Sequence, residues 1–169
     1  MINEPTAAGI AYLYEIQSDK LKTILIFDIG GGNFGISILK IKGNEYKVLA
    51  SEGEEHLGGE DFNQKLFDYV IEEIKKDQRF QNINLENKDL LKIKKPVDKI
   101  KNQISNINDA QLFIEDLNDS NDFKLSIETK KFQDLCENIW EKIFEKLNQT
   151  FKNINIKKTE TNNINWRFI

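Results

Sequence analysis

Three consecutive glycines follow an aspartate at the end of an apolar run, in the segment Asp28-Ile29-Gly30-Gly31-Gly32. Glycine allows backbone angles that side chains forbid, so several backbone N–H groups of such a run can converge on one anion. A phosphate group is the natural ligand of that arrangement. A run of glycines between two strands would equally suit a tight hairpin turn, so the glycines alone leave both interpretations open.

Asp28 adds a carboxylate to the start of this turn. A carboxylate next to bound phosphate repels it unless a cation lies between them, and Mg²⁺ that retains its waters is the usual solution. We therefore predict Asp28 as a magnesium-side acid that acts through water. The alternative is that Asp28 accepts hydrogen bonds from the backbone of the turn.

A small sheet must position these residues. Residues 22–27 form a continuous apolar run typical of a strand covered on both faces. Residues 34–41 alternate as a second strand, and the turn at 43–44 leads into a third at 46–49. The pattern predicts a three-stranded meander. A short buried helix is expected before it at residues 6–14, after Pro5.

Three more helices and a hairpin are expected further along. Residues 60–76 carry an apolar stripe, and residues 87–106 are helical with a break expected at Pro96. A hairpin is expected at 112–114 and 123–127, and Thr129 is expected to cap one long helix. Its single buried stripe would be Phe132, Leu135, Ile139, Ile143, Leu147 and Phe151.

Composition bounds the function. The chain has 169 residues, of which 39% are hydrophobic and 31% charged, which indicates one folded domain. A net charge of -4 argues against nucleic acid as a partner. Cys136 is the single cysteine, so no internal disulfide can form. No signal peptide or long apolar segment is present, which predicts a cytoplasmic protein without membrane contact.

Four segments in order resemble the nucleotide-binding domain of the seventy-kilodalton heat-shock chaperones: residues 3–8, 28–32, 56–62 and, more weakly, 101–105. The third reads His-Leu-Gly-Gly-Glu-Asp-Phe. The resemblance implies an α/β fold of the actin-like ATPase (ribonuclease H-like) type, of which this chain holds the second lobe only, a mixed sheet with packed helices.

The resemblance also implies a domain division and a set of partners. Residues 1–20 would be the lobe-crossing segment and helix, 21–152 the second lobe, and 153–169 a divergent tail without assignment. ATP or ADP with Mg²⁺ would be the ligands, and nucleotide-exchange factors or other cochaperones the partners, in a stress-response protein. The peptide-binding domain is separate in that family, so no client-peptide site is expected in this chain.

Residue roles carry over by position. Glu4 matches the carboxylate near the attacking water, Pro5 the proline that couples nucleotide state to the peptide-binding domain, and Asp28 the magnesium-side acid. The loop that holds the β and γ phosphates corresponds to Gly30, Gly31, Gly32 and Asn33, and Gly59 to a glycine near the nucleotide. Asp98, Lys101 and Ser105 occupy the places of a Glu, a Lys and a Ser around the adenosine.

The departures from the family pattern concern hydrolysis and adenine binding. The family has Thr-Phe-Asp after the glycines, where this chain has Asn33-Phe34-Gly35. Asn33 still offers a donor, but Gly35 lacks a carboxylate, so the rate should suffer more than binding. Asn102 replaces an arginine that follows the lysine of the adenosine helix, so the grip on adenine should be weaker.

The sequence thus predicts a partial ATP-binding domain of a heat-shock-type chaperone, with hydrolysis impaired or lost in isolation. No first lobe precedes Met1, and the resemblance stops near Lys158. The alternative is a non-enzymatic fragment that binds exchange factors or cochaperones. A sugar kinase is a weaker third hypothesis, because related kinases share the acid-and-glycine loop but neither residues 3–8 nor 56–62.

Overall fold

The computed structural model describes residues 3–16, 19–104, 107–117 and 121–154. The chain divides into two compact units. The first comprises Met1–Glu60 with Trp140–Ile169, and the second comprises Asp61–Ile139. Among the described helices, none has the length and apolar character to cross a bilayer.

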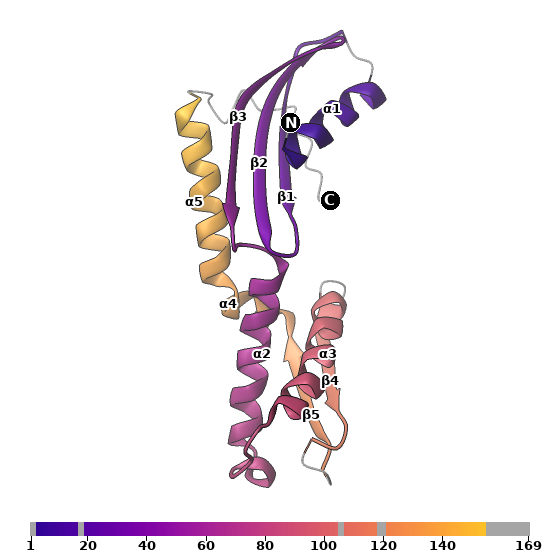
Figure 1. Cartoon of the computed structure of the whole chain (residues 1–169), viewed down its shortest axis with the longest axis vertical. Coiled ribbons are helices and arrows are strands. Elements are labelled where there is room, and N and C mark those ends of the chain that lie inside the picture. The colour runs from indigo at the N-terminus through magenta and orange to yellow at the C-terminus, as the bar shows by residue number, and fades with distance from the viewer. Residues whose placement is uncertain (1–2, 17–18, 105–106, 118–120, 155–169) are drawn as a thin grey trace. The chain divides into compact units, whose positions relative to one another are not determined.

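A three-stranded antiparallel sheet organises the first unit (Figure 1). Its strands β1 (Lys22–Ile29), β2 (Asn33–Lys42) and β3 (Glu45–Glu55) follow one another in space as in sequence. The expected meander is confirmed. A mixed sheet was also expected, but the strand pairing among the described residues is antiparallel in both sheets. Links as short as the one at Gly43, whose φ is +57°, join only antiparallel neighbours.

Helix α1 (Glu4–Ile16) packs on one face of this sheet. The expected helix is confirmed and begins two residues earlier than residue 6. Its contact with the sheet is close, because a Cβ added to Gly9 would stand 2.8 Å from Cδ1 of Ile26. Ile24, Ile26, Leu39 and Ile41 form the buried cluster beneath it.

The long helix expected from Thr129 is in fact two helices, α4 (Thr129–Leu135) and α5 (Glu137–Asn153). Cys136 interrupts them with φ and ψ of -99° and 4°. Its thiol is buried, and this burial raises the pKa of Cys136 to about 11. The side chain of Thr129 does not cap α4, because its hydroxyl donates instead to the carbonyls of Ile107 at 2.9 Å and Ile104 at 3.4 Å.

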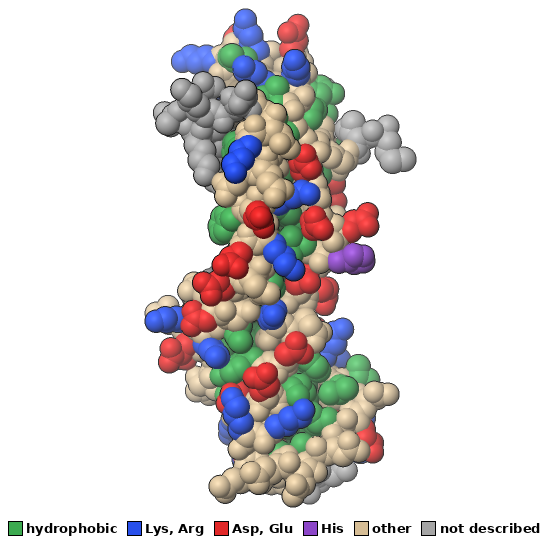
Figure 2. All heavy atoms as spheres, turned by 90° about the vertical axis from the view of Figure 1, so that its left-hand side faces the viewer, with side chains coloured by type: hydrophobic (Ala, Val, Ile, Leu, Met, Phe, Trp, Pro, Cys, Tyr) green, Lys and Arg blue, Asp and Glu red, His purple; other side chains and the backbone are tan. Residues whose placement is uncertain are grey.

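From Trp140 onward, α5 belongs to the first unit and lies beside β3 (Figure 1). Lys146 of α5 is 3.6 Å from the carboxylate of Glu54 and 3.9 Å from that of Glu52. Acidic and basic side chains are interspersed on the face shown in Figure 2. The buried residues of α5 here are Ile143, Leu147, Thr150 and Phe151.

The second unit has its own core. Its elements are α2 (Gly59–Lys76, from Asp61 onward), η1 (Gln78–Phe80), α3 (Asn87–Ile104), β4 (Asp109–Ile114), β5 (Phe123–Glu128) and α4. The expected hairpin of β4 and β5 is confirmed. The core residues of the helices are Leu66, Val70, Ile74, Ile93, Val97, Ile100 and Ile104, and those of the hairpin include Leu112, Ile114, Phe123 and Ile127.

The break expected at Pro96 is wrong, because α3 runs through it without interruption. An interior proline costs about 3 kcal/mol in an isolated helix. In α3 the buried residues Ile93, Val97 and Ile100 flank the proline on the core side, so the packing of both halves on one core outweighs that cost.

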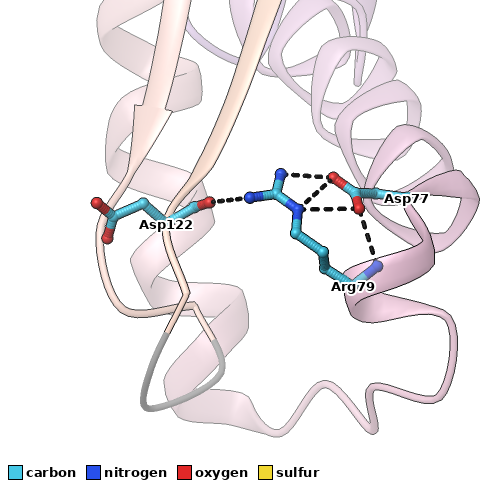
Figure 3. Close-up of polar contacts among 3 residues, drawn as sticks. All are labelled: Asp77, Arg79 and Asp122. Atoms are coloured by element: carbon cyan, nitrogen blue, oxygen red, sulfur yellow. Dashed lines mark hydrogen bonds and ion pairs between the residues drawn. The ribbon is translucent and has the colours of Figure 1, made fainter.

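Arg79 connects two loops of the second unit (Figure 3). Its guanidinium holds the carboxylate of Asp77, with Nη2 2.7 Å from Oδ2, and donates to the carbonyl of Asp122 at 3.3 Å. Asp77 also caps η1 by accepting from the N–H of Arg79 at 2.9 Å. These hydrogen bonds from Arg79 lower the pKa of Asp77.

Candidate functional site

The glycine loop, residues 30–33, joins β1 to β2 and closes with a hydrogen bond from the N–H of Gly30 to the carbonyl of Asn33 at 2.9 Å. None of its glycines adopts the left-handed φ that is found at Gly43. The expectation that the run is needed for forbidden dihedral angles is therefore wrong in detail. Glycine at these positions is therefore explained by the room around each residue rather than by its backbone angles.

The carbonyl groups of the three glycines are bound to the corner that follows β3. Gly30, Gly31 and Gly32 accept hydrogen bonds from the N–H groups of Gly59 at 2.9 Å, Glu60 at 2.7 Å and His56 at 3.0 Å, respectively. Gly59 and Glu60 open α2, and the first N–H groups of a helix lack partners within it. The loop thus serves as their cap and is in turn fixed by them.

The N–H groups of Gly31 and Gly32 point the other way. In a planar trans peptide the C=O and the following N–H are opposed, so tying the carbonyls of Gly30 and Gly31 to the corner directs these donors away from it. Both residues are exposed. A Cβ on either would meet no other described atom within 4 Å. The space around the Cα atoms of Gly31 and Gly32 is therefore open.

Gly58 supports the loop from the corner, a role that the sequence analysis missed. A Cβ there would stand 2.8 Å from the nitrogen of Asn33 and from the carbonyl oxygens of Gly30 and Gly31. Any side chain at position 58 would push the loop out of place. The available signal was the string at 56–62, from which only Gly59 had been assigned.

Asn33 lies at the end of the loop with an exposed side chain. Its Oδ1 occupies the space that a Cβ on Gly30 would need. A side chain at position 30 would clash with that of Asn33, whereas a Cβ at position 31 or 32 would enter open space.

Asp28 ends the buried part of β1 and is 7% exposed. Its pKa is raised, first because burial penalises the charged form and second because of the negative charge of Glu4. The charge of Glu4, a residue predicted from a distant part of the sequence, thus acts on Asp28. Both belong to the first unit, as do the glycine loop and the corner at 56–60.

The residues predicted around the adenosine belong to the second unit. Asp98 and Lys101 lie on α3, one helical turn apart, and both are half-buried. Oδ1 of Asp98 is buried without a hydrogen-bond partner among the described residues. Ser105 lies outside the described residues.

His56 and Trp140 have structural roles. The backbone of His56 has φ of 63° and binds the glycine loop, and its side chain is exposed. Trp140 packs against Phe144, with ring centroids 6.1 Å apart. Among the described residues, no three His, Cys, Asp or Glu side chains are placed to hold a metal ion together.

Comparison with known proteins places the chain in a family. The chain is 33% identical over 165 residues to a ribosome-associated molecular chaperone of Zygosaccharomyces rouxii. That match covers 97% of this chain but 27% of the relative, so the chain spans a minor part of its length. The family model described as "Hsp70 protein" matches residues 1–166. Because the match extends over nearly the whole chain, this protein belongs to the Hsp70 family.

Proposed function

We propose that this chain is part of the actin-like nucleotide-binding domain of an Hsp70-type chaperone, and that its glycine loop binds the phosphate groups of ATP or ADP. The observation that carries the proposal is the orientation of the loop. Its carbonyls are tied to the corner, and the N–H groups of Gly31 and Gly32 are directed into open space. Convergent backbone donors of this kind suit phosphate oxygens.

The first-unit residues also fit a magnesium ion. Asp28 places one buried carboxylate at the start of the loop, and no three-residue metal cluster is found among the described residues. Mg²⁺ usually keeps several waters and takes one or two carboxylates together with substrate phosphates. When bound, the ion would neutralise phosphate charge. Asp28 would hold it through water.

Glu4 is our candidate for orienting the water that attacks the terminal phosphate. It comes from the first turn of α1, and its charge acts on Asp28, so both acids lie close to the start of the loop. Hydrolysis should be slow, since Gly35 supplies no carboxylate. A Cβ at position 35 would stand 2.7 Å from Cγ of Pro5, so this arrangement leaves no room for an acidic side chain there.

The adenosine contacts are proposed for the second unit. Asp98 and Lys101 lie one helical turn apart on α3 and Ser105 follows them in the sequence, and Gly59 would lie near the nucleotide. Asn102 offers no planar cation, so we expect weak adenine binding.

A role in ATP-dependent protein folding follows from family membership and is proposed for the longer protein of which this domain forms part in its relatives. Exchange factors and cochaperones would be its partners, in a cytoplasmic, stress-responsive setting. The assignment of the chain to the second lobe belongs to the same proposal.

Titration calorimetry with ATP and Mg²⁺ tests the nucleotide site. We expect binding heat that is lost in Asp28→Ala and in the presence of EDTA, and that is retained in Glu45→Ala, which removes an exposed carboxylate at the start of β3. A folded protein that gives no heat at millimolar ATP would overturn the proposal and leave the non-enzymatic alternative.

Gly31→Ala isolates the role of the loop. The added methyl enters open space, so the free energy of unfolding should stay within about 0.5 kcal/mol of that of the parent. The same methyl obstructs an anion that approaches the N–H groups, so ATP affinity should fall at least about tenfold, or about 1.4 kcal/mol. Unchanged affinity would exclude these donors from the phosphate site.

A further inference from the structure

A groove in the second unit lies between α3 and the hairpin strand β4, which are neighbours in Figure 1. Its volume is about 340 Å³, and two buried residues, Ile100 and Leu112, belong to its lining. The exposed residues around them include Lys95 and Lys99 of α3 and Gln111 and Phe113 of β4. None of the residues proposed for the phosphate groups or for adenosine lines this groove.

The edge of β4 carries main-chain groups without partners. In an antiparallel ladder, residues that exchange hydrogen bonds with the partner strand alternate with residues whose N–H and C=O point away from it. The N–H of Thr129 donates to the carbonyl of Asn108 at 2.9 Å, so 108 and 129 form a hydrogen-bonded pair. The alternation then places Gln111 and Phe113 in the intervening pairs, which are not hydrogen-bonded.

The N–H and C=O groups of Gln111 and Phe113 are therefore directed away from β5. In the described part of the chain β4 pairs with β5 alone, and no other hydrogen-bond partner of these groups is found there. The two residues also line the groove, so β4 presents it with a free strand edge. Such an edge is a template for pairing with another chain.

The groove is positively charged. Both charged residues of its lining are lysines, Lys95 and Lys99, and neither makes an ion pair with a described residue. A third ammonium group, that of Lys124, lies 5.1 Å from the ring centre of Phe113. A complementary partner is therefore acidic.

We propose that this groove binds an extended acidic segment of another protein, which pairs with the free edge of β4 as an added strand. Main-chain hydrogen bonds to Gln111 and Phe113 supply the pairing, and the lysines select the charge. Lys95 and Lys99 are about 6 Å apart along the helix axis, close to the roughly 6.6 Å between alternate residues of a strand. Acidic side chains at every second position of the segment thus match both lysines.

The other positions of the added strand face the opposite side of the hairpin. The side chain of Phe113 lies there, 40% exposed, and cross-strand pairs of an aromatic and a β-branched residue stabilise a sheet. A segment in which Glu alternates with Val therefore suits both faces. The inference goes beyond the proposed nucleotide site and does not depend on it.

An acetylated and amidated octapeptide of alternating Glu and Val is the probe. Fluorescence anisotropy measures its binding to the full chain near neutral pH, and NMR measures the exchange of backbone amides. In the free chain the amides of Gln111 and Phe113 should exchange rapidly. Bound peptide should slow their exchange at least about tenfold, and the affinity should fall as salt is added.

Two control peptides separate charge from strand pairing. An octapeptide of alternating Lys and Val keeps the strand propensity but is repelled by the lysines, so it should bind at least about fivefold more weakly. A Glu-Val octapeptide methylated at every backbone nitrogen keeps the charge but has no donor for the edge of β4. It should also lose at least about fivefold in affinity.

Lys99→Glu tests the charge of the groove in the protein and should weaken binding of the Glu-Val peptide at least about fivefold. Lys94→Glu is the matched control, because it makes the same change at an exposed residue of α3 outside the groove. Its effect should not exceed about twofold.

Gln111→Pro tests the strand edge. It removes the outward N–H but no hydrogen bond to β5, and proline is tolerated at such edge positions. Binding of the Glu-Val peptide should weaken in Gln111→Pro and be retained in Gln111→Thr, which keeps the N–H. Should Gln111→Pro fail to fold, Lys99→Glu and the methylated peptide still decide the question.

The inference is overturned if the Glu-Val peptide does not bind saturably at millimolar concentration, or if it binds without slowing exchange at Gln111 and Phe113. Equal binding of the methylated peptide would also overturn it, because the groove would then accept anions without an added strand. Exchange at these residues that slows with rising protein concentration in the absence of peptide would show a second copy of the chain at the edge, against the proposal.

Discussion

Asp28 is held in the folded protein at an electrostatic cost. Its pKa lies above the ordinary value of 3.8 because of burial and the charge of Glu4, so folding disfavours the ionised form. The folded chain then binds more protons than the unfolded chain between 3.8 and the raised pKa, and the free energy of unfolding falls as the pH rises through that window. An acid retained under such a penalty is typical of a functional site.

Asp28→Asn should therefore raise the melting temperature at pH 7, because it removes the buried charge. The gain should shrink as the pH falls into the window and vanish below pH 3.8, where Asp28 is protonated in both states. Thermal unfolding monitored by circular dichroism at several pH values measures this. Glu45→Gln is the exposed control and should show no such pH-dependent gain. Equal melting temperatures for parent and Asp28→Asn at pH 7 would contradict the buried-charge account.

At the level of single residues, the sequence could predict the importance of some positions and not of others. Asp28 and the glycines stand out because a carboxylate and a glycine run at a strand end suit only a few roles, a phosphate site or a tight turn among them. The hydrogen bonds that Ser37 makes with Thr6 and Ser51 could not be predicted from the sequence. A serine in a strand is ordinary, and Thr6 is 31 residues away from Ser37. The sequence showed Gly35 only as a position where the family has a carboxylate. The structure shows that the ring of Pro5 packs against Gly35 and leaves no room for a Cβ there.

At the scale of elements, periodicity predicted the described strands, but it divided α3 in two and merged α4 with α5. The break expected at Pro96 is absent because both halves of α3 share one core. The break at Cys136 was missed because the apolar stripe continues across it. Local propensity loses to tertiary packing in the first case, and the continuing apolar pattern hides the interruption at Cys136 in the second.

Helix α5 allows a test of its stripe with two adjacent residues. Ile143 is fully buried, whereas Phe144 is 53% exposed. Ile143→Ala should lower the free energy of unfolding by about 2–5 kcal/mol, since it leaves a cavity. Phe144→Ala should change it by no more than about 1 kcal/mol, allowing for its contact with Trp140. Urea unfolding followed by circular dichroism compares them, and similar losses in both variants would contradict the assigned face of α5.

At the scale of the whole molecule, one expected domain has become two compact units, each with its own sheet and its own apolar core. Sequence length could not reveal this, because 169 residues suit one domain as readily. The first unit also joins residues from both ends of the chain, Met1–Glu60 and Trp140–Ile169. No local pattern carries that information. The proposed phosphate loop and adenosine face are divided between the two units.

If each unit is a separate source of stability, a mild core mutation should act mainly on its own unit. Ile36 in β2 and Ile93 in α3 are both fully buried, so Ile→Val at each removes one methylene and costs about 0.5–1.5 kcal/mol. Native-state hydrogen exchange then reports local opening. Ile36→Val should accelerate exchange in β1–β3 by about 2- to 12-fold and spare β4–β5, and Ile93→Val should do the reverse. Each variant is the control for the other. Equal acceleration of both sheets by either variant would show that the two cores open as one.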